Sequence, residues 1–404
     1  MTSSLDGLRV LDLSRVLAGP VCTQILGDLG AEIIKIERPG AGDDTRAWGP
    51  PFLKDDNGND TAESAYYLSC NRNKKSLTVD ISKPEGQKII RALMAKSDIV
   101  IENFKVGGLE KYGLGYEQIK GEFPKIIYCA ISGFGQNGPL APEPGYDFLA
   151  QAMGGLMSAT GEVDGSPMKA GVALSDVMTG LYAAIGILAA LNHRHQTGFG
   201  QMVDVSLLDV TLASMTNLAQ YYLTSGNVAP RQGNAHATIV PYQTFGTKDG
   251  HIVIAIGNDA QFKLFCRHIG QADWTDDARF TKNKDRVKNR DALTAMISAD
   301  IKNKTTEQWM ALFREADIPA APVQKMDDVF AMEQIAARNM NISLPHQASA
   351  SPVHLVGSPL KLSASPVTYR AAPPTLGQDT DDVLRTILNL KDGDIRALKD
   401  KGIV

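Results

Sequence analysis

The chain has 404 residues, of which 43% are hydrophobic and 21% are charged, and its formal net charge is −4. This composition is typical of a soluble enzyme and excludes a disordered chain, and the lack of a basic stripe with interleaved aromatic residues argues against nucleic acid as a partner. Because single hydrophobic cores stop growing at roughly 250–300 residues, we expect two lobes.

The cysteines and the apolar segments indicate a reducing compartment and no membrane. Cys22, Cys70, Cys129 and Cys266 lie far apart without a CxxC pair, which argues against both a zinc site and a disulfide framework. The amino terminus shows neither a basic nor an apolar leader segment. The longest apolar run, residues 177–191, is shorter than the roughly 20 residues of a membrane span, so it predicts a core helix. We expect a cytoplasmic protein without a metal site.

The first part of the chain alternates predicted strands with predicted helices. Aliphatic runs predict strands at residues 7–14, 31–37, 76–81, 98–102 and 125–132, and helical spacing predicts helices at 21–29 and 84–96. This alternation favours an α/β fold with a parallel sheet covered by helices. The glycines at 19, 27 and 30 lack G-x-G-x-x-G spacing, so a Rossmann-like shape would not imply a dinucleotide.

The remainder indicates a smaller lobe and a return to the first. A strand at 201–206 and a helix at about 207–224 continue the first lobe. A strand at 250–256 with helices at 261–269, 292–301 and 306–315 indicates an α+β lobe. We therefore expect a large domain over 1–224, a small domain over 225–325, and a segment 326–404, with a helix at 380–390, that runs back over the large domain.

Asp176 stands between a short apolar run that predicts a strand, from Lys169, and the apolar helix that ends near Leu191. An acid before an apolar helix is most often an N-cap, so capping is the leading interpretation from local physics. The alternative is a carboxylate nucleophile, which has to be partly desolvated and placed where backbone N–H groups receive negative charge. A helix start supplies such groups, so the two interpretations are geometrically compatible.

Other polar residues allow both a ligand-binding and a structural interpretation. Basic residues after strands or in loops of the first lobe would suit phosphates, or form a solvated surface: Arg38, Lys74, Lys75, Lys105 and Lys111. Asn103 and Phe104 follow a strand directly and favour ligand contact by hydrogen bonding and stacking. His236, in a polar turn, is more often a hydrogen-bonded structural residue than a base. No P-loop, G-x-S-x-G or H-E-x-x-H motif is present.

Six motifs in order make the chain similar to the family III coenzyme A transferases, which include formyl-CoA transferase and the carnitine CoA-transferases. They are Gly7–Pro20, Asp28–Gly40, Asn71–Ser76, Glu102–Phe104, Gly145–Asp147 and Ser175–Gly180. The resemblance implies an interlocked homodimer with a Rossmann-like large domain and a small domain. It also implies coenzyme A and acyl-CoA as substrates rather than as a permanently bound cofactor.

The same resemblance assigns roles to residues. The catalytic aspartate of the family falls on Asp176, which would carry CoA as an aspartyl thioester. The positions that contact CoA fall on Val16, Leu17, Ala18, Arg38, the segment from Lys75, Asn103, Phe104, Lys111, Tyr146 and Asp147. The six motifs thus favour the nucleophile over the cap for Asp176.

Within the family, Gly42–Pro51 and Ile239–Phe245 look most like the succinyl-CoA:glutarate CoA-transferase branch, which handles short dicarboxylic acids. Leu17 and Pro144 replace a Gln and a Lys of formyl-CoA transferase, and its glycine-rich lid is absent, which weakens a formate or oxalate substrate. Arg46 and Arg231, assisted by His236, are candidates to bind a distal carboxylate, because Arg offers a bidentate fork.

The main alternative is an α-methylacyl-CoA racemase of the same superfamily. Those racemases place a His before the acid of a Gly-His-Asp segment, and here that position is Tyr146. A racemase needs two bases beside the α-carbon, so the loss of the His removes one of them. A non-catalytic CoA-binding module is a further alternative, which the complete motif around Asp176 disfavours.

Overall fold

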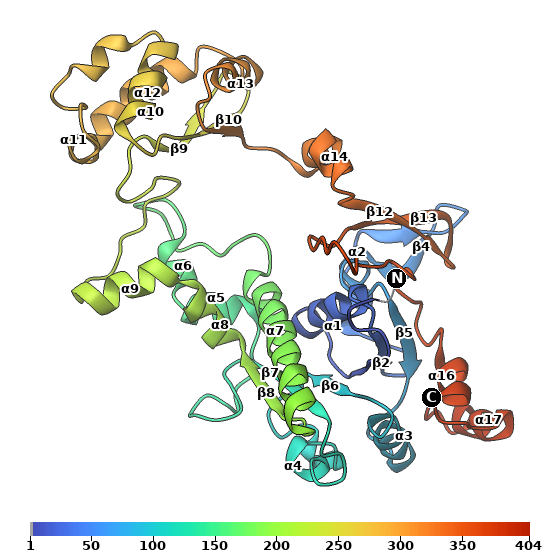
Figure 1. The fold of residues 1–404 in the computed structure, drawn as a ribbon. Helices are drawn as coiled ribbons and strands as arrows, with labels where there is room; N and C mark the ends of the chain where they lie inside the picture. Colours follow the sequence, from blue (N-terminus) through green and yellow to red (C-terminus); the bar gives the residue numbers. More distant parts are fainter. Residues whose placement is uncertain (1–2) are drawn as a thin grey trace. The chain divides into compact units, whose positions relative to one another are not determined.

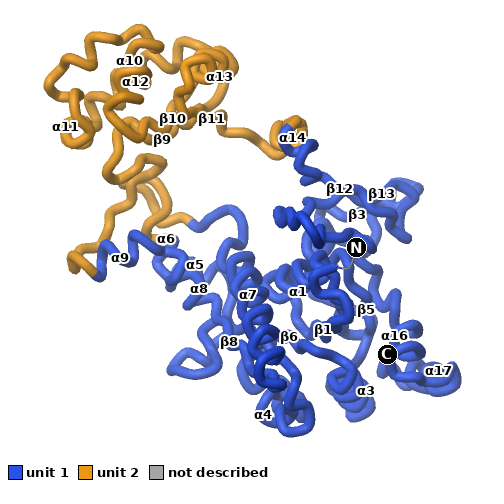
Figure 2. Tube along the Cα trace, in the orientation of Figure 1, with its two compact units in different colours: residues 1–156, 169–223, 334–404 blue, residues 157–168, 224–333 orange. Residues whose placement is uncertain are grey.

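The computed structural model describes residues 3–404, which form two compact units (Figure 2). Unit 1 comprises Met1–Leu156, Lys169–Leu223 and Gln334–Val404, and unit 2 comprises Met157–Met168 and Thr224–Glu333. The carboxy-terminal segment therefore belongs to the same unit as the amino-terminal one. The segment 157–168 joins unit 2, which differs from the continuous range 1–224 expected from the sequence.

Unit 1 is built on a six-stranded parallel sheet (Figure 1). Its strands are β1 (Arg9–Asp12), β2 (Glu32–Glu37), β5 (Lys74–Thr78), β6 (Ile99–Glu102), β7 (Ile127–Ser132) and β8 (Met202–Ser206). All five strand pairings are parallel. The α/β fold with a parallel sheet expected from the alternation of elements is confirmed.

Alternate residues of these strands enter two hydrophobic cores, one on each face of the sheet, as the two-residue period of a strand requires. Val10 and Ile33 pack on one face with helices α1 (Ala18–Asp28) and α7 (Leu174–Thr197). Leu11 and Ile34 pack on the other face, against helix α3 (Pro84–Met94) and the carboxy-terminal helices α16 (Thr380–Thr386) and α17 (Asp392–Asp400). Burial on both faces explains the continuous apolar runs in the sequence.

The spatial order of the strands is β5-β2-β1-β6-β7-β8. In chain order, β2 and β5 are added on one side of β1, and β6, β7 and β8 are then added on the other side. This is the order of the doubly wound Rossmann-type sheet, in which ligands bind beyond the carboxyl ends of the strands where the order reverses. The loops that follow β1 and β6 are therefore expected to line a site.

Smaller elements of unit 1 surround the sheet. The long connection between β2 and β5 contains a 3-10 turn (Asp44–Ala47), the antiparallel pair β3 (Phe52–Lys54) and β4 (Asp60–Ser64), and the short helix α2 (Ala65–Leu68). Another antiparallel pair is formed by β12 (Asn341–His346) and β13 (Ser349–Val356). The remaining helices are η2 (Glu110–Tyr112), α4 (Tyr116–Ile119), α5 (Asp147–Met153), α6 (Leu156–Ala159), α8 (Leu207–Ser214) and α9 (Thr216–Ser225), of which α6 and α9 extend into unit 2.

Unit 2 has its own core around a three-stranded antiparallel sheet. The sheet order is β11-β10-β9, with β9 (Tyr242–Gly246), β10 (His251–Ala255) and β11 (Ala320–Pro322). Its helices are α10 (Asp259–His268), η3 (Ala272–Thr275), α11 (Asn283–Lys288), α12 (Arg290–Ile301), α13 (Thr306–Glu315), α14 (Met326–Ala331) and α15 (Glu333–Ala337), the last of which leads into unit 1. Phe262, Phe265, Trp309 and Phe313 are buried at its centre.

Two local expectations differ from the structure. Residues 169–173 form no strand, and α7 begins at Leu174, so Asp176 lies inside the first turn of α7 rather than before it. The helix expected at 207–224 is divided at Met215 into α8 and α9, with a positive φ of 38° at Thr216. The N-cap residue of α7 is Ala173, and no side chain of this residue caps the helix. The interpretation of Asp176 as an N-cap is therefore wrong.

Helix α7 is long and apolar enough by length and composition to cross a membrane, with a mean hydropathy of 1.7. It packs, however, against α1, α5, α8 and the strands β7 and β8 of unit 1. Ala183, Ile187 and Leu191 are among its buried residues and belong to the core beneath the sheet. The prediction of a core helix for residues 177–191 is thus consistent with its packing.

Candidate active site

A cleft of about 540 Å³ opens at the reversal point of the sheet in unit 1, and Asp176 lies on its wall. We call it the nucleophile cleft. The loops after β1, β6 and β7 and the start of α8 line it. The residues are Arg15, Val16, Leu17, Ala18, Asp44, Trp48, Asn103, Phe104, Lys105, Val106, Ile131, Ser132, Gly133, Ala141, Glu143, Pro144, Gly145, Tyr146, Asp176 and Leu207.

A second cleft, of about 400 Å³, continues along the carboxyl ends of β1, β2 and β5. Arg38 lines it, and Arg15 and Phe104 line both clefts. The guanidinium of Arg15 lies 5.3 Å from the centre of the Phe104 ring and its Nη1 lies 3.2 Å from Asp44 Oδ2. Asp44 also lines both clefts, so their shared wall presents an Arg–Asp ion pair and one aromatic ring.

Close packing of α1 against α7 places Asp176 beside the loop after β1. A Cβ added to Gly180 of α7 would stand 2.6 Å from the carbonyl oxygen of Ala18, at the first residue of α1. Asp176 is four residues before Gly180. Because residues four apart share one face of a helix, Asp176 lies on the same face of α7 as Gly180, about 6 Å nearer to the amino terminus of α7. The nucleophile candidate therefore faces the amino terminus of α1, where Leu17, the N-cap residue, supplies no side-chain cap.

The environment of Asp176 disfavours its charged form. Burial, followed by the nearby negative charge of Asp147, raises the pKa of Asp176 to about 7. A carboxylate with a raised pKa is a more basic nucleophile, yet a large fraction remains ionised at neutral pH. The phenol of Tyr66 also lies near: burial and then the Asp176 charge raise the pKa of Tyr66 to about 12, so this hydroxyl keeps its proton.

An aromatic pair belongs to the same region. The rings of Trp48 and Tyr66 meet edge to face at 5.2 Å, and Trp48 lines the nucleophile cleft. Such a pair limits water near the Asp176 carboxylate while leaving one phenol as a hydrogen-bond donor. Neither Trp48 nor Tyr66 is among the site residues predicted from the sequence, because nothing in the spacing of the 38–75 connection brings either one near Asp176.

The loop after β1 is held by buried charges. Val16 has a φ of 70°, a conformation that β-branched residues rarely adopt. Its N–H donates to both carboxylate oxygens of Asp43 at 3.3 Å, and Asp43 pairs with Lys35 at 2.8 Å with both side chains fully buried. Lys35 also donates to the carbonyl oxygen of Ser14 at 2.9 Å. Although burial opposes it, the Lys35 charge holds the pKa of Asp43 at about 2.

The acid that ends β6 supports the second loop of the cleft. Glu102 is buried, and its Oε2 accepts a hydrogen bond of 2.7 Å from the backbone N–H of Phe104. Burial raises the pKa of Glu102 to about 8. Asn103 donates to the carbonyl oxygen of Arg15 at 2.7 Å and accepts from its N–H at 2.9 Å, which joins the loops after β1 and β6.

The chain matches a known protein family over most of its length. The family model described as CoA-transferase family III matches residues 5–380. The chain belongs to this family. The resemblance found in the sequence is confirmed, and the protein is an enzyme of the class that transfers coenzyme A.

Relatives and solved structures agree with this assignment. The chain is 43% identical over 400 residues to a succinyl-CoA:glutarate CoA-transferase of Mus musculus, covering 99% of this chain and 90% of that protein. It is 45% identical over 340 residues to a succinate–glutarate CoA-transferase of Agrobacterium fabrum, covering 84% and 85%. A crystal structure of a CAIB/BAIF family protein from Brucella suis matches with a TM-score of 0.88 and 43% identity, covering 96% of this chain and all of that one.

Most of the contact positions implied by the family lie together in unit 1. Val16, Leu17, Ala18, Asn103, Phe104 and Tyr146 line the nucleophile cleft with Asp176, and Arg38 lines the adjoining cleft. Asp147 follows Tyr146 and points its carboxylate at the start of α7, with its Oδ1 2.8 Å from the backbone nitrogen of Ser175.

Two of the family's implied cations lie outside both clefts. Lys75 pairs with Glu32 at 3.2 Å and Asp382 at 3.3 Å on the edge strand β5. Lys111 lies 4.7 Å from the centre of the Tyr112 ring in η2. Lys105, by contrast, lines the nucleophile cleft and is exposed. Of the basic side chains considered for phosphates, Arg38 and Lys105 are thus the ones that line these clefts.

Arg46 is not available to a substrate in this structure. Its side chain is 5% exposed and pairs with Glu37 at 2.7 Å and Glu63 at 2.6 Å. It also donates to Tyr67 Oη at 2.6 Å and to the carbonyl oxygen of Pro374 at 3.0 Å. With its donors used by two buried carboxylates, Arg46 holds the 38–75 connection to the sheet instead of binding a distal carboxylate.

Arg231 and His236 lie in unit 2. Arg231 donates to the carbonyl oxygens of Glu162 at 3.1 Å and Gly165 at 2.5 Å, so it pins the segment 157–168 to its own unit. His236 packs against Tyr242 with ring centres 5.3 Å apart, and its Nδ1 accepts a hydrogen bond from Thr238 N–H at 3.2 Å. The substrate roles of both residues stay predictions.

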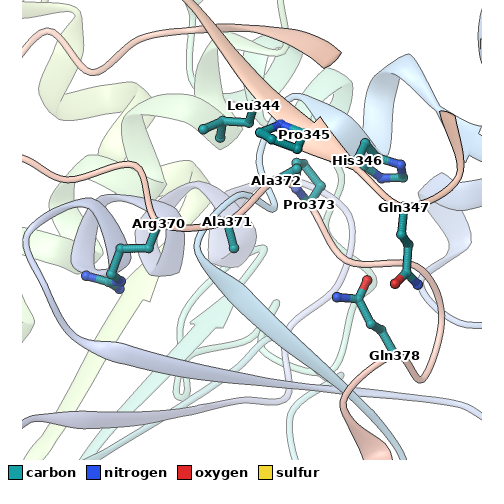
Figure 3. A pocket seen from close by; sticks show the side chains of 9 residues that line it. All are labelled: Leu344, Pro345, His346, Gln347, Arg370, Ala371, Ala372, Pro373 and Gln378. Carbon is teal, nitrogen blue, oxygen red and sulfur yellow. The ribbon is translucent and has the colours of Figure 1, made fainter. Parts of the chain in front are cut away.

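Another cavity of unit 1, of about 450 Å³, lies where the end of β12 meets residues 370–373 (Figure 3). Its polar side chains include His346, Gln347 and Gln378, and none of its lining residues lines the nucleophile cleft. Within residues 3–404, no group of three or more His, Cys, Asp or Glu side chains is placed to hold a metal ion.

Proposed function

We propose that the enzyme transfers CoA from succinyl-CoA to glutarate or a similarly short dicarboxylic acid, with Asp176 as the covalent carrier. The observation that carries the proposal is the position of Asp176, half-buried on the wall of a cleft at the reversal point of the sheet. Relatives named for succinyl-CoA and glutarate, at 43% identity over 99% of this chain, support this pair of acids.

The reaction proceeds through anhydrides and a thioester. A carboxylate oxygen of Asp176 attacks the carbonyl carbon of succinyl-CoA, the C–S bond breaks, and CoA leaves as the thiolate. The thiolate attacks the Asp176 carbonyl of the mixed anhydride, which releases succinate and forms the aspartyl-CoA thioester. A glutarate carboxylate attacks the carbonyl carbon of this thioester, the C–S bond breaks, and a second mixed anhydride and the CoA thiolate form. The thiolate then attacks the glutaryl carbonyl of this anhydride, which gives glutaryl-CoA and releases the Asp176 carboxylate. A carboxylate suits this role because anhydride and thioester both keep the acyl group activated.

Residues of the nucleophile cleft support separate parts of the reaction. The backbone N–H groups at the uncapped start of α1, beside Leu17 and Ala18, receive the developing oxyanion. Arg15 and Lys105, on the rim, and Arg38, in the adjoining cleft, meet the phosphates of CoA. Trp48 and Tyr66 limit the access of water to Asp176. This protects the aspartyl-CoA thioester from hydrolysis, which would consume succinyl-CoA without transfer.

The same proposal includes a homodimer. Unit 1 exposes large apolar side chains on α5, α7 and α8, namely Phe148, Leu149, Met153, Leu181, Tyr182, Ile185, Leu188 and Leu212. Such an apolar surface fits coverage by a second copy of the chain, as the interlocked dimer of the family would supply. Four free, buried cysteines fit a reducing compartment such as the cytoplasm.

The direct test is mass spectrometry of the intact enzyme after incubation with succinyl-CoA alone. Wild type gains a CoA-sized adduct on the peptide that contains Asp176, and Asp176→Ala gains none and transfers no CoA. Full turnover by the alanine variant would contradict the proposal. A panel of glutarate, malate, itaconate, oxalate and formate as acceptors then ranks the acids, and deuterium incorporation into a 2-methylacyl-CoA without any acceptor would indicate a racemase instead.

A further inference from the structure

The start of α7 is held by a carboxylate that comes from another helix. The Oδ1 of Asp147, the first residue of α5, accepts hydrogen bonds from the backbone N–H of Ser175 at 2.8 Å and of Asp176 at 3.3 Å. The N-cap residue Ala173 has no side chain that could serve these donors. Asp147 thus performs, from a distance of 28 residues in sequence, the capping that a local Ser or Asp usually performs.

The Asp147 carboxylate is itself oriented by a buried amide. Gln151, one turn later on α5 and fully buried, donates to Asp147 Oδ2 at 2.8 Å. The amide oxygen of Gln151 accepts from the backbone N–H of Ala170 at 2.9 Å. The segment that enters α7 is therefore anchored at Ala170 by Gln151 and at Ser175 and Asp176 by Asp147.

This arrangement has an electrostatic consequence for the nucleophile. A free helix start would stabilise the charged form of Asp176, because its N–H groups carry partial positive charge. Here those groups already serve Asp147, and burial with the added negative charge of Asp147 raises the pKa of Asp176. The titratable groups around Asp176 are Asp147 from α5, Tyr66 from α2 and, around the cleft, Arg15, Asp44, Lys105, Glu143 and Tyr146.

We propose that Asp147 is a positioning residue for Asp176, which fixes the first turn of α7 and places a second carboxylate beside the nucleophile, rather than a contact for CoA. The inference rests on the proposed function, in which the Asp176 carboxylate attacks the thioester. It differs from the role that the family resemblance implies for Asp147, because both oxygens of its carboxylate are used inside unit 1.

The experiment compares Asp147→Asn and Asp147→Ala with wild type and with Asp392→Asn. Asp392 is a matched control, since it is an exposed acid in the first turn of α17 and lines neither cleft. The measurements are the pH profile of kcat, the KM for succinyl-CoA, and the rate of adduct formation on Asp176.

The two variants separate charge from geometry. Asn at 147 keeps one oxygen that accepts both N–H groups but carries no charge, and its NH2 group replaces the oxygen that accepts from Gln151. The acid midpoint of the kcat profile therefore moves about one pH unit lower, with KM unchanged within about twofold. Ala at 147 removes the acceptor as well, and kcat and the rate of adduct formation fall about 100-fold, as expected when a reacting group loses its alignment. Asp392→Asn keeps the wild-type profile.

Other outcomes overturn the inference. A wild-type midpoint in Asp147→Asn would show that the Asp147 charge does not act on Asp176. A tenfold higher KM for succinyl-CoA with unchanged kcat in either variant would make Asp147 a CoA contact. If the alanine variant does not fold, the midpoint of the asparagine variant decides alone. Failure of the proposed function is distinct, because wild type itself would then form no adduct on the Asp176 peptide.

Discussion

Gly180 of α7 lies against Ala18 of α1 so closely that a Cβ on Gly180 would stand 2.6 Å from the Ala18 carbonyl oxygen and 3.0 Å from Val21 Cγ1. A backbone atom cannot move aside as a side-chain end can. This contact brings the uncapped start of α1 to the same face of α7 as Asp176. The distance between the proposed nucleophile and its proposed oxyanion donors thus depends on the absence of a methyl group at Gly180.

Gly180→Ala is therefore expected to lower both stability and kcat. The added methyl group separates α1 from α7, at a cost of about 1–3 kcal/mol in the free energy of unfolding, which exceeds the gain in helix propensity of up to about 1 kcal/mol. Gly186→Ala in the same helix is the control, since its Cβ would meet only the Val203 side chain. Thermal unfolding and kcat check the pair, and equal effects of both substitutions would contradict this account.

Asp176→Asn is expected to stabilise the enzyme at alkaline pH while abolishing transfer. Because the pKa of Asp176 is raised from 3.8 to about 7 in the folded state, its stability contribution is full below about pH 4 and is lost as pH rises through 7. Asn has no charge to bury, so the gain at pH 8 is about 1–2 kcal/mol after allowance for partial solvent screening. Urea unfolding at pH 5 and pH 8 measures it, and a variant less stable than wild type at pH 8 would contradict the sign.

The activity of wild type should follow the same ionisation. In the proposed reaction only the deprotonated Asp176 attacks, so kcat is expected to rise with pH through a midpoint near 7. Glu102, next to Asn103 of the cleft, is another acid whose pKa is raised, to about 8. The variant Glu102→Gln keeps an acceptor for Phe104 N–H and should keep the midpoint near 7; a shifted midpoint in this variant would assign the titration to Glu102.

The pair Lys35 and Asp43 is expected to control the affinity for acyl-CoA through Val16. Asp43→Asn leaves the Lys35 charge buried and unpaired, which costs about 3–5 kcal/mol. The double variant Lys35→Met/Asp43→Leu removes both charges and recovers part of this stability, because Thr45 N–H also loses its Asp43 acceptor. Its KM for succinyl-CoA stays raised about tenfold, because Val16 N–H and the Ser14 carbonyl lose their partners. Recovery of KM together with stability would refute the link to the loop.

Arg46→Met should unfold the protein more readily rather than alter acceptor choice. The substitution leaves the carboxylates of Glu37 and Glu63 buried without their cation, at a cost of about 3–5 kcal/mol. The KM for glutarate, measured on the folded fraction at low temperature, is expected to stay within about twofold of wild type. A large and selective rise in that KM would restore Arg46 as the residue that binds the distal carboxylate.

The alternation of strands and helices could be predicted from the sequence because both faces of the sheet demand apolar residues at regular spacing. The predicted limits of a strand were wrong where a charged side chain is buried. The strand expected at 76–81 runs from Lys74 to Thr78, because Lys74 is fully buried with Asp12, its Nζ lying 3.4 Å from Asp12 Oδ2. Two consecutive lysines, Lys74 and Lys75, are typical of a loop in a sequence. Only the buried partner of Lys74, Asp12, shows that they belong to a strand.

The sequence by itself determined the α/β class, the family and Asp176 as nucleophile candidate, since periodicity is local and the family motifs are contiguous. Tertiary structure decided what surrounds each charge: Arg46 turned inward to Glu37 and Glu63, and Asp147 placed at the start of α7. The physical reason is that burying a charged side chain costs desolvation free energy unless an opposite charge or hydrogen-bond donor lies beside it. These partners come from segments far apart in the chain.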